Sequence, residues 1–148
     1  MKANYEKKSG KWFGVVAGSL LMCAGMARAE QVSIYGPDAD KFMTSLESMG
    51  VLSSFDNNGG FVMQLKELDC YVPVVPNPKA NCFALEATES GETFDDSRDS
   101  RTVYNMLVNY GAAYDDGSVG ASKAGLFDVS CYRLISTGET SCTGRTKM

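Results

Sequence analysis

The sequence contains no histidine, and this absence excludes several classes of enzyme. Catalytic centres of the Ser-His-Asp and Cys-His types need an imidazole to activate the nucleophile, and histidine also serves as a general base and metal ligand. No two cysteines have the C-x-x-C spacing of a thioredoxin-like dithiol, and the glycines match no phosphate-binding fingerprint. We therefore predict that the protein is not an enzyme and that it binds no cofactor.

Long apolar runs are missing as well. Near the N-terminus, sixteen uncharged residues over 12–27 fall short of the roughly 20 that a membrane-spanning helix needs. They follow a lysine-rich start and end in an Ala-Arg-Ala tripeptide, which is the order of parts in a secretory signal peptide. We predict that residues 1–29 are a signal peptide cleaved near Ala29. Residues 30–148 then form a single exported domain, periplasmic or secreted, with no stable membrane span.

Positive charge is scarce in the exported part. The whole chain has 14 Lys or Arg and 18 Asp or Glu, of which the first 29 residues hold five and one, so 9 basic and 17 acidic residues remain, a net charge of −8. Such a surface is a poor partner for nucleic acid or an anionic membrane. Six of the acids lie between Glu86 and Asp99. We interpret this segment as a solvated loop, with an acidic patch for a basic protein as the alternative.

Four cysteines remain after the signal peptide is removed: Cys70, Cys82, Cys131 and Cys142. An even number of cysteines in an oxidising compartment indicates disulfides rather than a zinc site. Four cysteines allow three connectivities. Pairing Cys70 with Cys82 and Cys131 with Cys142 closes two short loops of similar size. The pattern of the surrounding sequence favours this connectivity over the other two.

That pattern is an internal repeat. A shift of 61 residues places Cys70-Tyr71 on Cys131-Tyr132 and Leu46 on Leu107. Each half also contains an amphipathic helix that ends in glycine, a polar turn with glycine, an apolar strand and a return strand. The expected helices cover 37–50 and 100–111, and the expected strands cover about 61–72, 81–87, 124–135 and 140–145.

These elements predict an α+β fold of two layers. Two tandem helix-strand-strand repeats, about 37–88 and 98–146, form a four-stranded antiparallel sheet with both helices on one face and the disulfides as staples. Apolar residues of both parities occur in the first strand, where Leu65 and Leu68 fall on opposite sides. This pattern predicts either a β-bulge or a second buried face, covered by a loop, a homodimer mate or a target protein.

Acidic residues provide two weaker candidates for chemistry. A carboxylate-dependent hydrolase would need a pair drawn from Glu86, Glu89, Asp95 and Asp96. A calcium loop would use the alternating oxygens of Asp95, Ser97 and Asp99, or the turn acids Asp115 and Asp116, but the glycine and distal glutamate of such a loop are missing. We interpret these residues as loop, cap and turn residues, and predict no metal site.

The loop between Cys70 and Cys82 is the best candidate for recognition. It holds three of the four prolines of the chain, which stiffen the backbone and reduce the entropy lost on binding. An ordinary turn between two strands is the simpler alternative. The predicted partner-binding residues are Tyr71, Val74, Val75, Pro76, Asn77 and Lys79.

Together these features predict a small exported binding protein that occludes a protein target, of the inhibitor or immunity type. The alternative is a structural or assembly component of the cell envelope or of a surface appendage, and a hydrolase is the least favoured. A homodimer is compatible with either of the first two.

Overall fold

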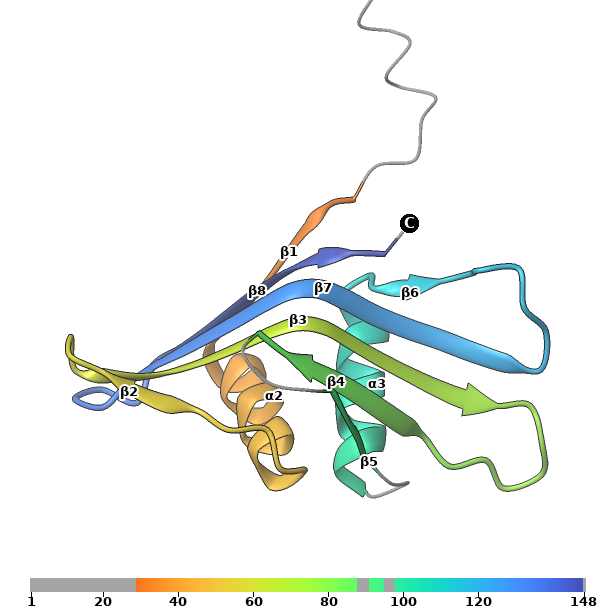
Figure 1. Ribbon diagram of the computed structural model, residues 1–148, viewed down its shortest axis with the longest axis horizontal. Coiled ribbons are helices and arrows are strands. Elements are labelled where there is room, and N and C mark those ends of the chain that lie inside the picture. The colour runs from red at the N-terminus through yellow and green to blue at the C-terminus, as the bar shows by residue number, and fades with distance from the viewer. Residues whose placement is uncertain (1–28, 88–90, 95–97, 148) are drawn as a thin grey trace, which may run out of the picture.

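The computed structural model describes residues 29–87, 91–94 and 98–147 (Figure 1). The predicted signal peptide lies outside these residues except for Ala29, and so do parts of the acidic segment, 88–90 and 95–97. The elements are β1 (Gln31–Tyr35), α2 (Gly36–Ser48), β2 (Ser54–Asp56), β3 (Gly60–Pro73), β4 (Asn81–Glu86), β5 (Gly91–Phe94), α3 (Arg98–Asn109), β6 (Ala113–Tyr114), β7 (Ala121–Leu134) and β8 (Thr140–Thr146).

The fold is mixed α+β, as predicted, but the antiparallel sheet formed by the described residues has eight strands instead of four. The main order is β1-β8-β7-β3-β4-β5, with β2 added to β3 and β6 added to β7. The four predicted strands are β3, β4, β7 and β8. The prediction of four strands is wrong because β1 joins through β8, more than 100 residues away in sequence, and because β2, β5 and β6 are only three, four and two residues long. Strands that short leave no periodic pattern.

Both helices lie on the same face of the sheet, and the long central strands bend over them (Figure 1). Helix α2 places Phe42, Met43 and Leu46 in the core with no exposed surface, and α3 does the same with Val103 and Leu107. Each helix is followed by a glycine with positive φ, Gly50 at 108° and Gly111 at 83°, which is the expected termination by a left-handed residue.

Two β-bulges explain the apolar residues of both parities. The β3–β4 register shifts between Leu65 and Glu67, and the β7–β8 register shifts between Phe127 and Ser130. An extra residue in a strand reverses the side on which the following side chains lie. Leu65 and Leu68 therefore both face the core, with 2% and 0% of their surface exposed. The bulge alternative is confirmed.

The predicted disulfides are both present, Cys70–Cys82 across β3 and β4, and Cys131–Cys142 across β7 and β8. All four cysteines are buried in the hydrophobic core. Disulfides of this kind indicate an oxidising, extracytoplasmic compartment. Among the described residues, no helix is long and apolar enough to cross a membrane.

Arg133 of β7 fastens the sheet to helix α2. Its guanidinium donates from Nε to Asp40 Oδ1 at 3.1 Å, from Nη1 to Glu47 Oε1 at 3.1 Å and from Nη2 to Thr44 Oγ1 at 2.9 Å. We expect Arg133→Ala to lower the free energy of unfolding by about 1.5 kcal/mol, because it removes three charge-assisted bonds from a partly buried side chain. Urea unfolding followed by circular dichroism measures the change.

The matched control is Arg145→Ala. Arg145 pairs with Asp128 at 2.6 Å, but the two side chains are 52% and 61% exposed. An exposed pair contributes about 0.5 kcal/mol or less. Equal losses in the two variants would contradict the role given to Arg133.

Candidate functional site

Two loops meet at one end of the sheet, the β3–β4 connection (74–80) and the β6–β7 connection (115–120) (Figure 1). The amide of Val74 donates to the carbonyl oxygen of Gly120 at 2.8 Å, which extends the β3–β7 pairing beyond the strand ends. Three valines at this end are exposed: Val74 by 73%, Val75 by 54% and Val119 by 95%. We call these three side chains the valine tip.

The loop between Cys70 and Cys82, which we call the proline loop, is held at both of its ends. The disulfide closes its base, and the guanidinium of Arg101 on α3 donates to the carbonyl oxygen of Pro78 at 3.0 Å. Asn81 donates from Nδ2 to the carbonyl oxygen of Lys79 at 3.2 Å. Asn77 has φ of 52°, in the left-handed region that asparagine tolerates better than most residues. These bonds restrict the loop before any partner arrives.

The six predicted binding residues are all exposed in this one segment: Tyr71, Val74, Val75, Pro76, Asn77 and Lys79. Their role in binding stays a prediction. Sequence reasoning missed Val119, because this residue lies in the polar turn with glycine that precedes the second apolar strand. Nothing local to Val119 indicates its position, since only the pairing of β3 with β7 brings the two loops together.

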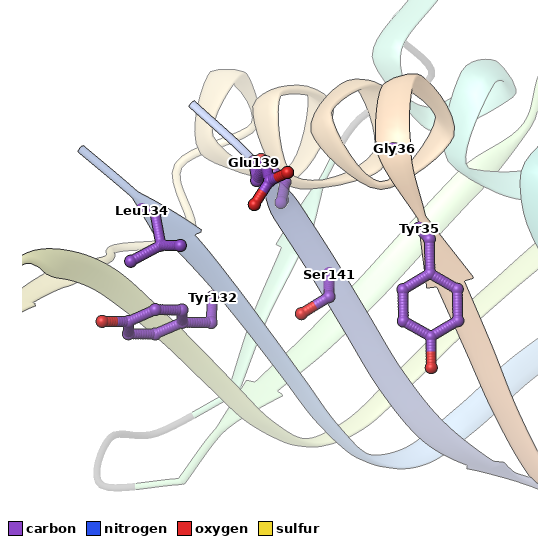
Figure 2. Close-up of a pocket in the computed structure, with 7 residues that line it drawn as sticks. Tyr35, Gly36, Tyr132, Leu134, Glu139 and Ser141 are labelled. Carbon is purple, nitrogen blue, oxygen red and sulfur yellow. The ribbon is translucent and has the colours of Figure 1, made fainter. Parts of the chain in front are cut away.

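A shallow groove of about 320 Å³ lies near the opposite end of the sheet, on the face away from the helices (Figure 2). Tyr35 of β1 and Tyr132 of β7 both pair with Ser141 of β8, so the two rings lie on either side of it. Leu134 and Glu139 complete the walls, together with Gly36 and Thr140. The groove offers aromatic surface and one carboxylate, which suits a shallow contact with a macromolecule.

The aromatic ring of Tyr132, which lines this groove, lies directly over Gly60. A Cβ atom on Gly60 would lie 2.5 Å from the Tyr132 ring, so only glycine leaves room for it. The Tyr132 hydroxyl reaches Asp56 Oδ1 at 3.4 Å. Desolvation and the negative charge of Asp56 raise the pKa of Tyr132, so its hydroxyl stays protonated at neutral pH. The ring forms a fixed wall of the groove.

Several of the acidic candidates for chemistry lie outside the described residues. Of the four hydrolase candidates only Glu86, at the end of β4, is described; Glu89, Asp95 and Asp96 lie outside the described residues. The same holds for Ser97 of the calcium candidate, while Asp99 lies in the first turn of α3. Within residues 29–87, 91–94 and 98–147, no group of three or more potential metal ligands occurs.

Asp115 and Asp116 are turn residues. Asp115 Oδ1 accepts from the amide of Gly117 at 2.8 Å, and Asp116 Oδ1 accepts from the amide of Ser118 at 3.0 Å. A hydrogen bond from Lys123 Nζ at 2.7 Å holds the pKa of the Asp116 carboxyl well below its usual range. Both carboxylates therefore stabilise the β6–β7 loop, in which Val119 is exposed.

Comparison with protein-family models, with curated proteins and with solved structures finds no match to this chain. A functional proposal therefore depends on the chain's own side chains. Of the arrangements described above, the valine tip combines the largest apolar exposure with the firmest support.

Proposed function

We propose that the protein is a small exported binding protein whose valine tip enters or covers an apolar cleft on a protein target, as an inhibitor or immunity protein does. The observation that carries the proposal is the joining of two loops into one apolar end, with Val74 bonded to Gly120 and Val119 95% exposed. Exposed apolar clusters on a soluble protein are typical of interaction sites. After cleavage near Ala29, the periplasm or the exterior is the proposed location.

The restraints on the proline loop support binding rather than a passive turn. A loop that is already ordered loses little conformational entropy when it docks, so more of the buried apolar area contributes to affinity. The counterpart loop between β7 and β8 contains no proline and has one exposed large apolar side chain, Ile135. The β3–β4 and β7–β8 hairpins thus share a disulfide, but only the β3–β4 hairpin has the proline-containing loop for which recognition is proposed.

The strand pairing supports the proposed tandem repeat. Adding 61 to the bounds of β3, Gly60–Pro73, gives the bounds of β7, Ala121–Leu134, and these two strands pair with each other along their whole length. The shift that aligns the two halves of the sequence therefore also places one central strand on the other, as a duplicated unit related by an approximate two-fold axis would do.

A structural or assembly role in the cell envelope or a surface appendage is the second proposal. Strand β1 is an edge strand whose sequence, QVSIY, has neither charge nor proline. Edge strands without such residues can accept a further strand from another chain. A carboxylate-dependent hydrolase is the least favoured proposal, and of its four candidate residues only Glu86 is described.

Site-specific photo-crosslinking tests the main proposal. A photoreactive amino acid at position 75 is expected to capture one protein of the cell envelope, because Val75 belongs to the tip. The same group at position 108 is the control, since Val108 is 39% exposed but lies on helix α3. Equal capture at both positions would contradict the proposal. Crosslinked oligomers that contain only copies of this chain would favour the assembly role instead.

A further inference from the structure

An ammonium group is enclosed on the outer face of the sheet, away from both the valine tip and the groove. Lys147 Nζ pairs with Glu67 Oε2 and lies 3.7 Å from Asp69 Oδ1. It also lies 4.8 Å from the centroid of the Phe127 ring and 5.5 Å from that of Tyr114. Two carboxylates and two aromatic faces are the groups that bind ammonium ions best in proteins. We call Glu67, Asp69, Tyr114 and Phe127 the lysine cage.

The walls of the cage are supported independently of Lys147. They come from β3, β6 and β7, and the Tyr114 hydroxyl donates to Asp69 Oδ1 at 2.5 Å. Burial and this hydrogen bond raise the pKa of Tyr114, so the hydroxyl keeps its proton and remains a donor. Gly125 leaves the space for this bond, because a Cβ there would lie 2.9 Å from Asp69 Oδ1 and 2.5 Å from the Leu68 carbonyl oxygen.

Lys147 enters the cage from outside the strands that form its walls. Strand β8 ends at Thr146, whose amide donates to the carbonyl oxygen of Glu30 at 2.8 Å. Lys147 follows that strand, and its ammonium group reaches Glu67, Asp69 and the two aromatic rings. That side chain is 9% exposed. The lysine cage thus encloses the side chain of Lys147, a residue that lies just after the last strand.

We infer that the lysine cage is a recognition site for a lysine side chain of a partner protein, and that Lys147 occupies it in the free protein. An empty cage would leave Glu67 and Asp69 as neighbouring, partly desolvated carboxylates, so the site needs a cation. The exported part carries a net charge of −8 (9 basic minus 17 acidic residues), which favours a basic partner. This inference does not depend on the valine tip.

The test removes Lys147 and supplies a substitute. In Lys147→Ala, n-butylammonium chloride is expected to raise Tm in a saturable way, by about 5 °C at ten times its dissociation constant. Sodium chloride at the same concentration is the reference. The wild-type protein is expected to gain less than about 1 °C, because Lys147 competes at an effective concentration on the order of millimolar or more.

The double variant Glu67→Gln with Lys147→Ala is the matched control, and it is expected to lose most of the gain. Equal stabilisation by sodium chloride, or an undiminished gain in the control, would overturn the ammonium site. If Lys147→Ala does not fold by itself, its refolding yield in n-butylammonium chloride is compared with that in sodium chloride. A higher yield in n-butylammonium chloride supports the ammonium site, and equal yields overturn it.

A second measurement separates a partner's lysine from a purely internal contact. The wild-type protein, in which Lys147 must be displaced, is titrated by NMR with a large excess of the peptide acetyl-Gly-Lys-Gly-amide and of its norleucine analogue. Chemical-shift changes at Glu67 and Asp69 are expected only with the lysine peptide. A cage that binds n-butylammonium but not the lysine peptide would be closed to another chain, and the partner assignment would be wrong.

Discussion

Replacement of all four core cysteines by alanine is expected to leave the domain formed by residues 30–148 largely unfolded at 37 °C. The bridges join residues 12 and 11 positions apart. Loops of this length correspond to about 3 kcal/mol each in the chain-entropy account, hence about 6 kcal/mol together. Domains of this size have a total stability of about 5–15 kcal/mol. The loss is therefore comparable with the whole free energy of folding.

Variants that lack one bridge each show whether the two contributions match. Cys70→Ala with Cys82→Ala and Cys131→Ala with Cys142→Ala are each expected to cost about 3 kcal/mol, since the loops are similar and all four sulfurs are buried. Thermal and urea unfolding followed by circular dichroism measure the losses. A quadruple variant with a Tm within about 5 °C of wild type would show that the hydrophobic core maintains the fold without the two disulfides.

Substitution of Val74 and Val119 by aspartate is expected to lower the affinity for the target captured at position 75 by at least about 100-fold. Each change removes apolar area from the contact and places a carboxylate in it, and burying an unpaired charge is strongly unfavourable. Because the two side chains are 73% and 95% exposed in the free protein, the free energy of unfolding is expected to change by no more than about 0.5 kcal/mol.

Val108→Asp is the control for a general effect of added negative charge. Binding is measured by surface plasmon resonance or calorimetry, and stability by urea unfolding of the same preparations. Binding that survives the double change at the tip, or that falls equally with Val108→Asp, would place the contact elsewhere. The tyrosine groove around Tyr35 would then be the next surface to change.

Local patterns predicted much of this fold. The helix faces of Phe42 and Leu46, and of Val103 and Leu107, follow from apolar spacing, and the glycines after them follow from the left-handed conformation that ends a helix. Pairing of the cysteines followed from their place in a repeated pattern. Even the bulge in β3 was indicated, because Leu65 and Leu68 cannot both face the core in a regular strand.

Features that depend on distant residues were not predictable in this way. Strand β1 exists as part of the sheet because Gln31–Tyr35 pairs with β8 at the other end of the chain. Val119 is part of a binding candidate only because Val74 lies beside Gly120. The lysine cage brings together residues from β3, β6, β7 and the segment after β8, none of which is unusual in its own sequence context.

By itself the sequence determined the two helices, four of the strands, the disulfide pairing and the exclusion of histidine chemistry. Each of these depends on residue type or short-range spacing, and such properties are present before the chain folds. Tertiary structure alone decided the eight-stranded sheet, the joining of two loops at the valine tip and the enclosure of Lys147. These depend on the register of β3 against β7, which places residues more than 40 positions apart in contact.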